Sequence, residues 1–469
     1  MTAIVWFRRD LRVHEHPALR AALTRCERVV CVFCFDDRLL HGRHESGPRT
    51  QFLLECLHDL DCSLRDRGGG LVIRHGPPQR ELRALAEDIG ATEIHFTTDV
   101  TPFARHRGET AGRALAGAGL ELHAHPGLTV IDAPGEVRTQ KGKPQTVFTP
   151  YYRVWLGQPR REVLGAPRKM PALPAELGKG RIPSLKSLGL TQEVEDPLPG
   201  GERAARKRMH AFLRGAVADY GSNHDALGAD KTSRLSPYLR FGCVSARELE
   251  DRLPAGEGPE AFRRQLCWRD FYQQVILHRP QNAGREHQER YRGTIDWNDD
   301  DEGFEAWTNG RTGYPLVDAG MRQLRREGWM HNRARLVVGS FLTKYLGIDW
   351  RWGERWFMRL LIDGDEANNN GNWQWIASVG TDPQPAFKRI YNPALHMERF
   401  DPRGHYVRRY VPELRPVPDE HLREPWEMPE QVQRKVSCVI GEDYPEPMVD
   451  RREARDEALA RYRLASGSA

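Results

Sequence analysis

The most informative stretch of this chain is residues 350–375, WRWGERWFMRLLIDGDEANNNGNWQW. Apolar residues recur at helical spacing on both sides of its LIDGD turn, which predicts two helices, at 350–362 and 368–379. Five of the chain's 12 tryptophans lie here, around Asp363, Asp365 and several asparagines. So many aromatic rings beside polar groups suit a cavity that holds a large planar cofactor with polar edges. In the structural alternative, the aspartates cap helices and the tryptophans fill a core.

Two of these tryptophans, Trp373 and Trp375, fall on different sides of the second helix. One ring can therefore face the interior of a cofactor cavity while the other faces the surface. An aromatic series beside a redox cofactor is also a route for electrons, so this stretch favours light or redox chemistry.

Helical patterns continue through the whole C-terminal half of the chain, and strand patterns almost vanish beyond residue 201. Further helices are predicted at 202–219, 245–252, 259–278, 315–327, 330–346 and 449–465. We therefore expect residues 201–469 to form an all-α domain.

Residues 1–128 alternate strand and helix patterns instead. Strands are predicted at Ile4–Phe7, Val29–Phe35, Leu71–Arg74, Glu93–Phe96 and Glu121–His125. Five β–α units predict an α/β domain with a doubly wound, mostly parallel five-stranded sheet. No GxGxxG follows the first strand, so a dinucleotide fingerprint is missing. Residues 129–200 are rich in proline, glycine and basic residues, and we expect an interdomain connector that packs partly on both domains.

The bulk composition is that of a globular protein, with 29% charged and 39% hydrophobic residues among 469. No apolar run is long enough for a transmembrane helix, and the N-terminus lacks a secretory signal, so we expect a cytoplasmic protein. The net charge of +5 and the pI near 8.7 fit a polyanionic partner, although an arginine-rich genome gives the same excess.

Eight cysteines are scattered along the chain. Cys31 and Cys34 form a CxxC inside a predicted strand, where alternation places their side chains on opposite faces. Packed thiols are therefore expected, and without a second CxxC the cysteine spacing predicts no metal site.

Three further motifs carry chemistry. Tyr220 is followed by the hydroxyl-rich run at 232–236, which can cap a helix or bind phosphate. FRRQLCWRD at 262–270 offers an amide, an indole and a guanidinium to one region, although a helix with one buried tryptophan would look the same. GWMHNRARL at 328–336 places His331, Asn332 and Arg335 close together on a helix.

Taken together, these motifs resemble the photolyase/cryptochrome family, and most closely the microbial class I cyclobutane pyrimidine dimer photolyases. The resemblance rests on VWFRRDLRVHEHPAL, TSRLSPYLRFG, WRDFY, GYPLVDAGMRQL, GWMHNRAR, LIDGDEANNNGNWQW and KRIYNP, in order and over nearly the whole length. It implies light-driven DNA repair, in which excited reduced FAD gives an electron to the dimer, the cyclobutane ring splits and the electron returns.

By resemblance, FAD binds in the helical domain. The implied contacts are Tyr220, Thr232, Ser233, Arg234, Leu235, Ser236, Phe262, Arg269, Arg335, Asp363, Gly364, Asp365 and Asn369. Arg335 would pair with Asp363 beside the flavin ring, and Asn369 would face its N5. An asparagine there cannot protonate N5, which favours the reduced anion. Trp307, Trp350 and Trp373 match a three-tryptophan relay that photoreduces the flavin.

The implied substrate is UV-damaged DNA with the dimer flipped out of the duplex. Gln265, Trp268, Asn332, Leu336 and Trp375 would frame the lesion, and Arg333 and Arg408 would contact DNA phosphates. Gln265 departs from the usual glutamate, and Leu336 from a frequent methionine. Glutamine is usual in (6-4) photolyases and animal cryptochromes, but those repair enzymes need a second histidine where this chain has Asn332.

The family also carries an antenna pigment on the α/β domain. RTQFLLECL at 49–57 and DVTPFARHRGE at 99–109 look more like the members that bind 8-hydroxy-deazaflavin than those that bind methenyltetrahydrofolate. Phe35, Arg49 and Asp99 are the candidate contacts, and an empty antenna site is the alternative. We expect a monomer.

Three other functions stay open from the sequence: a cryptochrome-like blue-light sensor without repair, (6-4) photoproduct repair, and an unrelated flavin oxidoreductase. The last would need a nicotinamide site, for which the sequence has no fingerprint.

Overall fold

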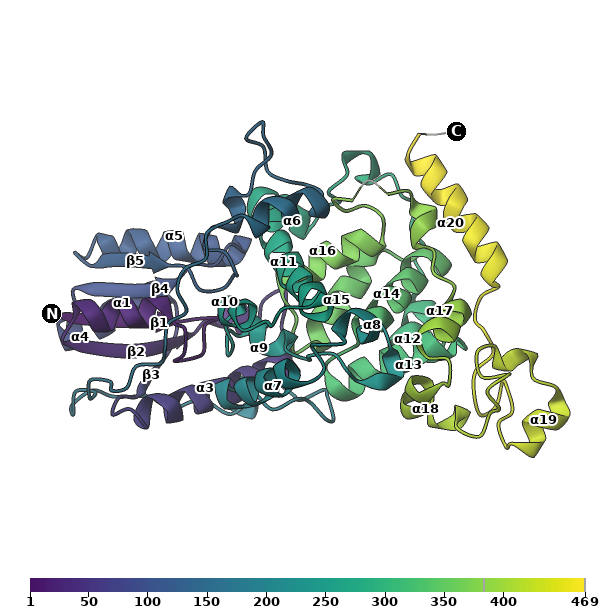
Figure 1. Cartoon of the computed structure of the whole chain (residues 1–469), viewed down its shortest axis with the longest axis horizontal. Helices are drawn as coiled ribbons and strands as arrows, with labels where there is room; N and C mark the ends of the chain where they lie inside the picture. The colour runs from purple at the N-terminus through teal and green to yellow at the C-terminus, as the bar shows by residue number, and fades with distance from the viewer. Residues whose placement is uncertain (383, 468–469) are drawn as a thin grey trace.

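A parallel sheet covered by helices on both faces forms the α/β part at one end of the long axis (Figure 1). This computed structural model describes residues 1–382 and 384–467. The strands are β1 (Thr2–Phe7), β2 (Arg28–Phe35), β3 (Leu71–His75), β4 (Glu93–Thr97) and β5 (Glu121–His125). All pairings are parallel, in the order β3-β2-β1-β4-β5, and the predicted doubly wound sheet is confirmed.

The helices of the α/β part are α1 (Pro17–Arg25), α2 (Asp37–Leu40), α3 (Gly47–Arg65), α4 (Pro78–Ile89) and α5 (Pro102–Ala116). Prolines stand in the first turn of four of them, where the missing N–H costs nothing. Side-chain caps add to this signal: His16 accepts the N–H of Leu19, and Ser46 accepts the N–H of Arg49.

Strand alternation divides the apolar side chains between two cores. Cys31 packs on one face of the sheet and Cys34 on the other, as the alternation predicts. The core on the Cys31 face does not stop at the sheet, because it continues through buried residues of the connector into the helical part.

The connector contains η1 (Pro134–Glu136), α6 (Phe148–Leu156) and η2 (Lys186–Leu188). Helix α6 was not predicted, since its aromatic and β-branched residues have a weak helical preference. Burial outweighs that preference: Tyr151 and Trp155 are fully buried, and α6 packs on α11 (Glu257–His278).

The rest of the chain is helical (Figure 1). The bounds are α7 (Glu202–Arg214), α8 (Tyr220–Asn223), α9 (Ser236–Arg240), α10 (Ala246–Asp251), α12 (Asp301–Asn309), α13 (Pro315–Glu327), α14 (Asn332–Ser340), α15 (Trp350–Leu360), α16 (Glu366–Ile376), α17 (Pro393–Phe400), α18 (His405–Tyr410), α19 (Glu430–Lys435) and α20 (Arg451–Ala465). The helix predicted at 330–346 is α14 followed by a π turn, Phe341–Tyr345. The short helices α8, α9, α12, α17, α18 and α19 escaped prediction.

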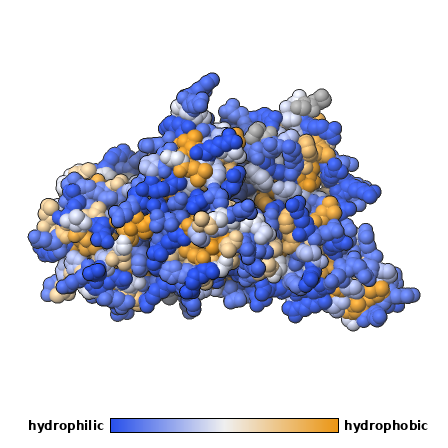
Figure 2. Space-filling view, in the orientation of Figure 1, coloured by the Kyte–Doolittle hydropathy of each residue, from blue (hydrophilic) through white to orange (hydrophobic). Residues whose placement is uncertain are grey.

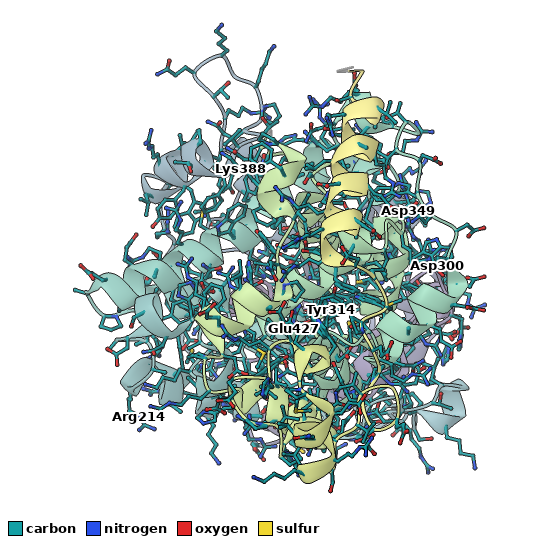
Figure 3. The ribbon with its side chains drawn as sticks, turned by 90° about the vertical axis from the view of Figure 1, so that its right-hand side faces the viewer. Arg214, Asp300, Tyr314, Asp349, Lys388 and Glu427 are labelled. Carbon is teal, nitrogen blue, oxygen red and sulfur yellow. The ribbon has the colours of Figure 1, made fainter. Side chains whose placement is uncertain are left out.

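Aspartates begin several of these helices. Asp300 accepts the N–H of Gly303 at α12, and Asp349 accepts the N–H of Arg351 at α15. Both caps are labelled in Figure 3, which views the helical end of the molecule. Helix α20 runs along the outside of that end.

The surface in view is largely hydrophilic with scattered apolar patches (Figure 2). Among the described residues, no helix is both long and apolar enough to cross a membrane.

Candidate flavin and lesion site

A cavity of about 460 Å³ opens inside the helical part. Its walls come from α8, α9, α11, α14, α16 and the turn between α15 and α16. All thirteen predicted cofactor contacts and all five predicted lesion contacts line it: Tyr220, Thr232, Ser233, Arg234, Leu235, Ser236, Phe262, Arg269, Arg335, Asp363, Gly364, Asp365 and Asn369, with Gln265, Trp268, Asn332, Leu336 and Trp375. Motifs more than 150 residues apart therefore meet at one place.

Burial divides the cavity into a deep part and an open rim. Asp363, Asp365 and Asn369 are buried, whereas Gln265 and Asn332 are exposed. The predicted cofactor set thus lies mostly inside, and the predicted lesion set lies at the mouth.

Two buried oxygens in the cavity wall lack a hydrogen-bond partner among the described residues, Thr232 Oγ1 and Asp363 Oδ1. An unpaired buried oxygen costs about 1–3 kcal/mol, so a polar ligand that satisfies both is favoured. A cofactor with hydroxyl, phosphate and heterocyclic N–H groups meets that need, which a purely apolar ligand does not.

The turn between α15 and α16 holds the acidic groups of the cavity. Arg335 Nη2 lies 2.8 Å from Asp363 Oδ2, so the ion pair that the resemblance implied is formed. Asp365 caps α16 by accepting the N–H of Asn368 at 3.0 Å. Asn369, one turn further on, donates its side-chain amide to the carbonyl of Glu354 at 3.1 Å.

Arg9, in the loop after β1, joins the two parts of the molecule by binding Asp365, which lines the cavity. Its guanidinium pairs with both Asp365 and Asp99, the latter at 3.2 Å. Burial alone would raise the pKa of Asp365, but the charges of Arg9, Arg240 and Arg269 hold that pKa well below its usual range. The carboxylate is therefore ionised at neutral pH and can accept a hydrogen bond from a heterocycle.

Arg9 was not among the predicted contacts. It lies in the FRRD motif, which served only to support the resemblance. A contact across 356 residues of sequence is not visible from local patterns.

Aromatic rings back the inner wall of the cavity. Trp373 lines the cavity, and its ring centroid lies 6.3 Å from that of Trp307 and 5.0 Å from that of Phe357. Trp307 is fully buried, and so is Trp350, whose indole has no recorded ring partner among the described residues. Trp373 and Trp307 are therefore neighbouring rings in the inner wall.

Trp268 and Trp375, at the mouth, each have a firm support. Phe148 of the connector stacks on Trp268 with centroids 3.6 Å apart, and the guanidinium of Arg389 lies 4.0 Å from the ring centroid of Trp375. Neither Phe148 nor Arg389 was predicted from the sequence. Both supports fix the orientation of indoles that line the open rim.

Two family descriptions match the chain: "DNA photolyase" over residues 3–174 and "FAD binding domain of DNA photolyase" over residues 262–464. A deoxyribodipyrimidine photo-lyase of Streptomyces griseus is 44% identical, with 99% of both chains covered. The chain belongs to the photolyase/cryptochrome family. The match to an FAD-binding domain supports FAD as the cofactor of the helical part.

Other members of the photolyase/cryptochrome family are equally extensive matches. A crystal structure of a class III photolyase from Agrobacterium tumefaciens has a TM-score of 0.93 and 34% identity, covering 99% of this chain and 98% of that one. A protein of Natronomonas pharaonis named cryptochrome DASH is 36% identical over 96% of this chain and 98% of its own length. The family therefore includes both repair enzymes and proteins named as cryptochromes.

The two arginines that the family resemblance assigns to DNA phosphates are already paired. Arg333 pairs with Asp225, and its guanidinium lies 4.2 Å from the ring centroid of Phe400. Arg408 pairs with Asp419 at 2.8 Å. Each side chain is about one-fifth exposed, 18% for Arg333 and 23% for Arg408, so a phosphate would have to share these guanidinium groups with the aspartates or replace them.

The three antenna candidates of the family resemblance lie around the border between the two parts. Arg49 donates to the backbone carbonyls of Met358 and Leu361, and thus ties α3 to α15. Asp99 is occupied by Arg9. Phe35 is buried at the end of β2, with its ring centroid 6.1 Å from that of His75.

A second, more open cavity of about 800 Å³ lies beside the hairpin at 138–144 of the connector. Its wall contains basic residues, two histidines, prolines and side chains with hydroxyl or amide groups, without the carboxylates and tryptophans of the first cavity. The volume of a cavity therefore does not by itself identify the functional site of this photolyase-family chain.

Proposed function

We propose that this chain repairs cyclobutane pyrimidine dimers in UV-damaged DNA by light-driven chemistry with bound FAD. One observation carries the proposal: a single cavity places a buried acidic and amide-rich interior directly behind an aromatic rim. When bound, the flavin supplies the electron that light transfers to the dimer, and it takes that electron back after the ring has split.

The interior residues bind and orient the cofactor. Asp363 is held by Arg335, which leaves Asp363 Oδ1 free to accept from the cofactor. Asp365, kept ionised by Arg9, would accept a hydrogen bond from an N–H of the flavin ring. Asn369 presents an amide, which hydrogen-bonds without releasing a proton at neutral pH.

The rim residues bind the lesion. Enzymes that act on a base in duplex DNA, photolyases among them, must first extrude it from the stack. Trp268 and Trp375 offer indole surfaces on which the two pyrimidines can stack, at about 1–3 kcal/mol per base. Gln265 and Asn332 add exposed amides that can pair with pyrimidine carbonyl and N–H groups.

The choice of lesion rests on the residue after His331. Burial lowers the pKa of His331 to about 4, so its imidazole is neutral at physiological pH. Its Nδ1 accepts the N–H of Arg333 at the start of α14. Asn332 then stands where a second histidine would be needed for (6-4) chemistry, which favours cyclobutane dimers.

For photoreduction we assign the inner position of the electron relay to Trp373, which lines the cavity. The outermost member must reach solvent, and full burial makes Trp307 unsuitable for that place. Trp297 is half-buried, and the N–H of Asn298 bonds the carbonyl of Gly347 at 2.8 Å, three residues before Trp350. We therefore assign the sequence Trp373, Trp350 and Trp297, with Trp297 a residue that sequence comparison alone had passed over.

The antenna assignment remains 8-hydroxy-deazaflavin, bound near Phe35, Arg49 and Asp99. Support comes only from the local motifs at 49–57 and 99–109. Extraction of the purified protein and chromatography of its pigments tests it, because a deazaflavin and a folate differ in mass and absorption.

Binding in the dark tests the substrate assignment separately from light chemistry. Equal-length duplexes with one thymine dimer, one (6-4) photoproduct or no damage are compared at several salt concentrations. We expect tightest binding to the thymine dimer, with affinity falling as salt rises because phosphate contacts release counterions. Equal affinity for all three duplexes would contradict the proposal and favour the light-sensor function.

A further inference from the structure

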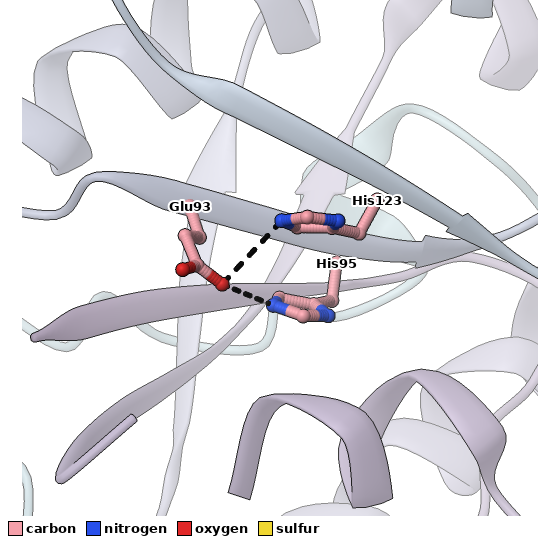
Figure 4. A group of neighbouring side chains, drawn as sticks. All are labelled: Glu93, His95 and His123. Atoms are coloured by element: carbon pink, nitrogen blue, oxygen red, sulfur yellow. Dashed lines mark hydrogen bonds and ion pairs between the residues drawn. The ribbon is translucent and has the colours of Figure 1, made fainter. Parts of the chain in front are cut away.

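Three polar side chains meet on one face of strands β4 and β5, on the side covered by α1 (Figure 4). Glu93 and His95 are two residues apart on β4, and the register pairs His95 with His123 of β5. Glu93 and His95 are buried, at 3% and 0% exposure, while the side chain of His123 is 21% exposed. A carboxylate and two imidazoles therefore converge under a partly open edge of the sheet.

The distances in this cluster are those of ligands around one small metal ion. Glu93 Oε2 lies 3.1 Å from His95 Nε2 and 3.4 Å from His123 Nε2. Tetrahedral Zn²⁺ with bonds of about 2.0–2.1 Å separates its ligand atoms by about 3.3 Å. All three candidate ligand atoms lie within 4.8 Å of one another.

The donor types also suit a zinc ion. Carboxylate oxygens and imidazole nitrogens are among the ligands that Zn²⁺ takes in proteins. His123 Nε2 is buried and has no hydrogen-bond partner among the described residues. This nitrogen is therefore available to a metal ion.

Neighbouring groups hold the cluster in place. Arg25 Nη2 donates to the other carboxylate oxygen, Glu93 Oε1, at 3.2 Å. His95 Nδ1 lies 3.0 Å from His125 Nε2, which fixes the His95 ring with Nε2 toward Glu93. Partners of this kind orient metal ligands in many proteins. Glu121, exposed and 3.3 Å from His123 Nε2, or a water can complete a fourth position.

We propose that Glu93, His95 and His123 bind one Zn²⁺ ion, which joins the edge strand β5 to the rest of the sheet. The cysteine spacing had predicted no metal site, because histidines on neighbouring strands meet only through strand register. Arg25 Nε, now 3.1 Å from Glu93 Oε2, must withdraw from that oxygen while Nη2 stays on Oε1. The site does not depend on the flavin or on DNA.

Titration of the chelator-treated full-length chain with ZnCl₂, or with CoCl₂ as a coloured substitute, tests this proposal. We expect one ion per chain, visible absorption typical of tetrahedral cobalt, and a higher unfolding temperature with zinc. His123→Gln should weaken binding at least about tenfold. The matched control His106→Gln changes an exposed histidine on α5 and should bind as the wild type does.

Absence of saturable binding at micromolar metal would overturn the proposal. Binding that is equal in the wild type and in His123→Gln would do so as well, since another group would then hold the ion. Flavin absorbance measured in every sample shows that each variant is folded.

Discussion

The ring of Phe148 lies parallel to the indole of Trp268, at an interplanar angle of 4° and a centroid distance of 3.6 Å. Phe148 belongs to the connector and Trp268 to helix α11, 120 positions later. A segment that looks like a linker in the sequence thus supports one wall of the cavity mouth.

This support predicts that Phe148→Ala weakens dark binding of a thymine-dimer duplex by about 2- to 12-fold. The range follows from the 0.5–1.5 kcal/mol of an aromatic pair. Fluorescence anisotropy measures the affinity. Val147→Ala, at a neighbouring exposed position, is the matched control and should bind normally. If Phe148→Ala bound the duplex as tightly as the wild type, the orientation of Trp268 would not depend on Phe148.

Asp363→Asn should release FAD. The change breaks a charged pair with Arg335 at 2.8 Å in a largely buried place, which costs about 1.5–3 kcal/mol, or roughly 10- to 100-fold in affinity. The flavin-to-protein absorbance ratio after gel filtration reports the loss. Glu305→Gln, which disturbs the exposed pair with Arg311, serves as the control. Full retention of FAD in Asp363→Asn would place the cofactor elsewhere.

The electron relay predicts different outcomes for two half-buried tryptophans. Trp297→Phe should lower the yield of flavin photoreduction at least about tenfold, because the outermost hole carrier is lost. Trp352→Phe should have little effect, since the ring that contacts both Trp352 and Trp307 is that of Phe304, which is much harder to oxidise than an indole. Flash photolysis measures the yields. The reverse order of effects would assign the exit to Trp352.

Gln265→Glu tests whether the amide at the rim limits repair. A protonated glutamate would donate a stronger hydrogen bond to the charged dimer, so we expect faster ring splitting, by up to about fivefold. Repair quantum yield in the purified variant measures it. An unchanged or lower quantum yield would mean that the amide of Gln265 does not limit repair.

The buried carboxyl of Asp270 should make the free energy of unfolding depend on pH. Burial raises the pKa of the Asp270 carboxyl to about 6. The hydrogen bonds that it accepts from the N–H groups of Trp155, Val130 and Ile131 favour ionisation but only partly offset burial. The folded state therefore holds this proton at pH values where the unfolded chain, with an aspartate pKa near 3.9, has lost it. Its contribution to stability is complete below about pH 4 and falls as the pH rises to about 6.

Thermal unfolding between pH 4 and 7 measures this contribution. Asp270→Asn cannot titrate, so the wild type should lose stability relative to it over that range, by up to about 3 kcal/mol. Parallel pH profiles for the two proteins would mean that Asp270 stays ionised in the folded chain.

The sequence predicted elements best where local signals mark both ends. Pro315 and Gly328 bound α13, and the structure gives that helix the predicted limits. The apolar run of β2 was equally clear. By contrast α6 forms because Tyr151 and Trp155 are buried by distant segments, which no local preference shows.

The same distinction holds for the site. Side chains within one motif, such as Arg335 or Asp365, were found through that motif. Arg9 and Phe148 contact cavity residues that are far from them in the sequence, and only the fold brings these partners together. Trp297 could be assigned to the relay only from the exposure of its side chain together with its position in the fold.

The most direct measurement is repair itself. Reduced protein is mixed with an oligonucleotide that carries one thymine dimer, and dimer loss is followed under near-UV or blue light and in the dark, with a (6-4) oligonucleotide in parallel. We predict loss of the thymine dimer in the light only, and no loss of the (6-4) photoproduct. Intact lesions of both kinds, in a protein with bound and photoreducible FAD, would contradict the repair function and favour a light sensor.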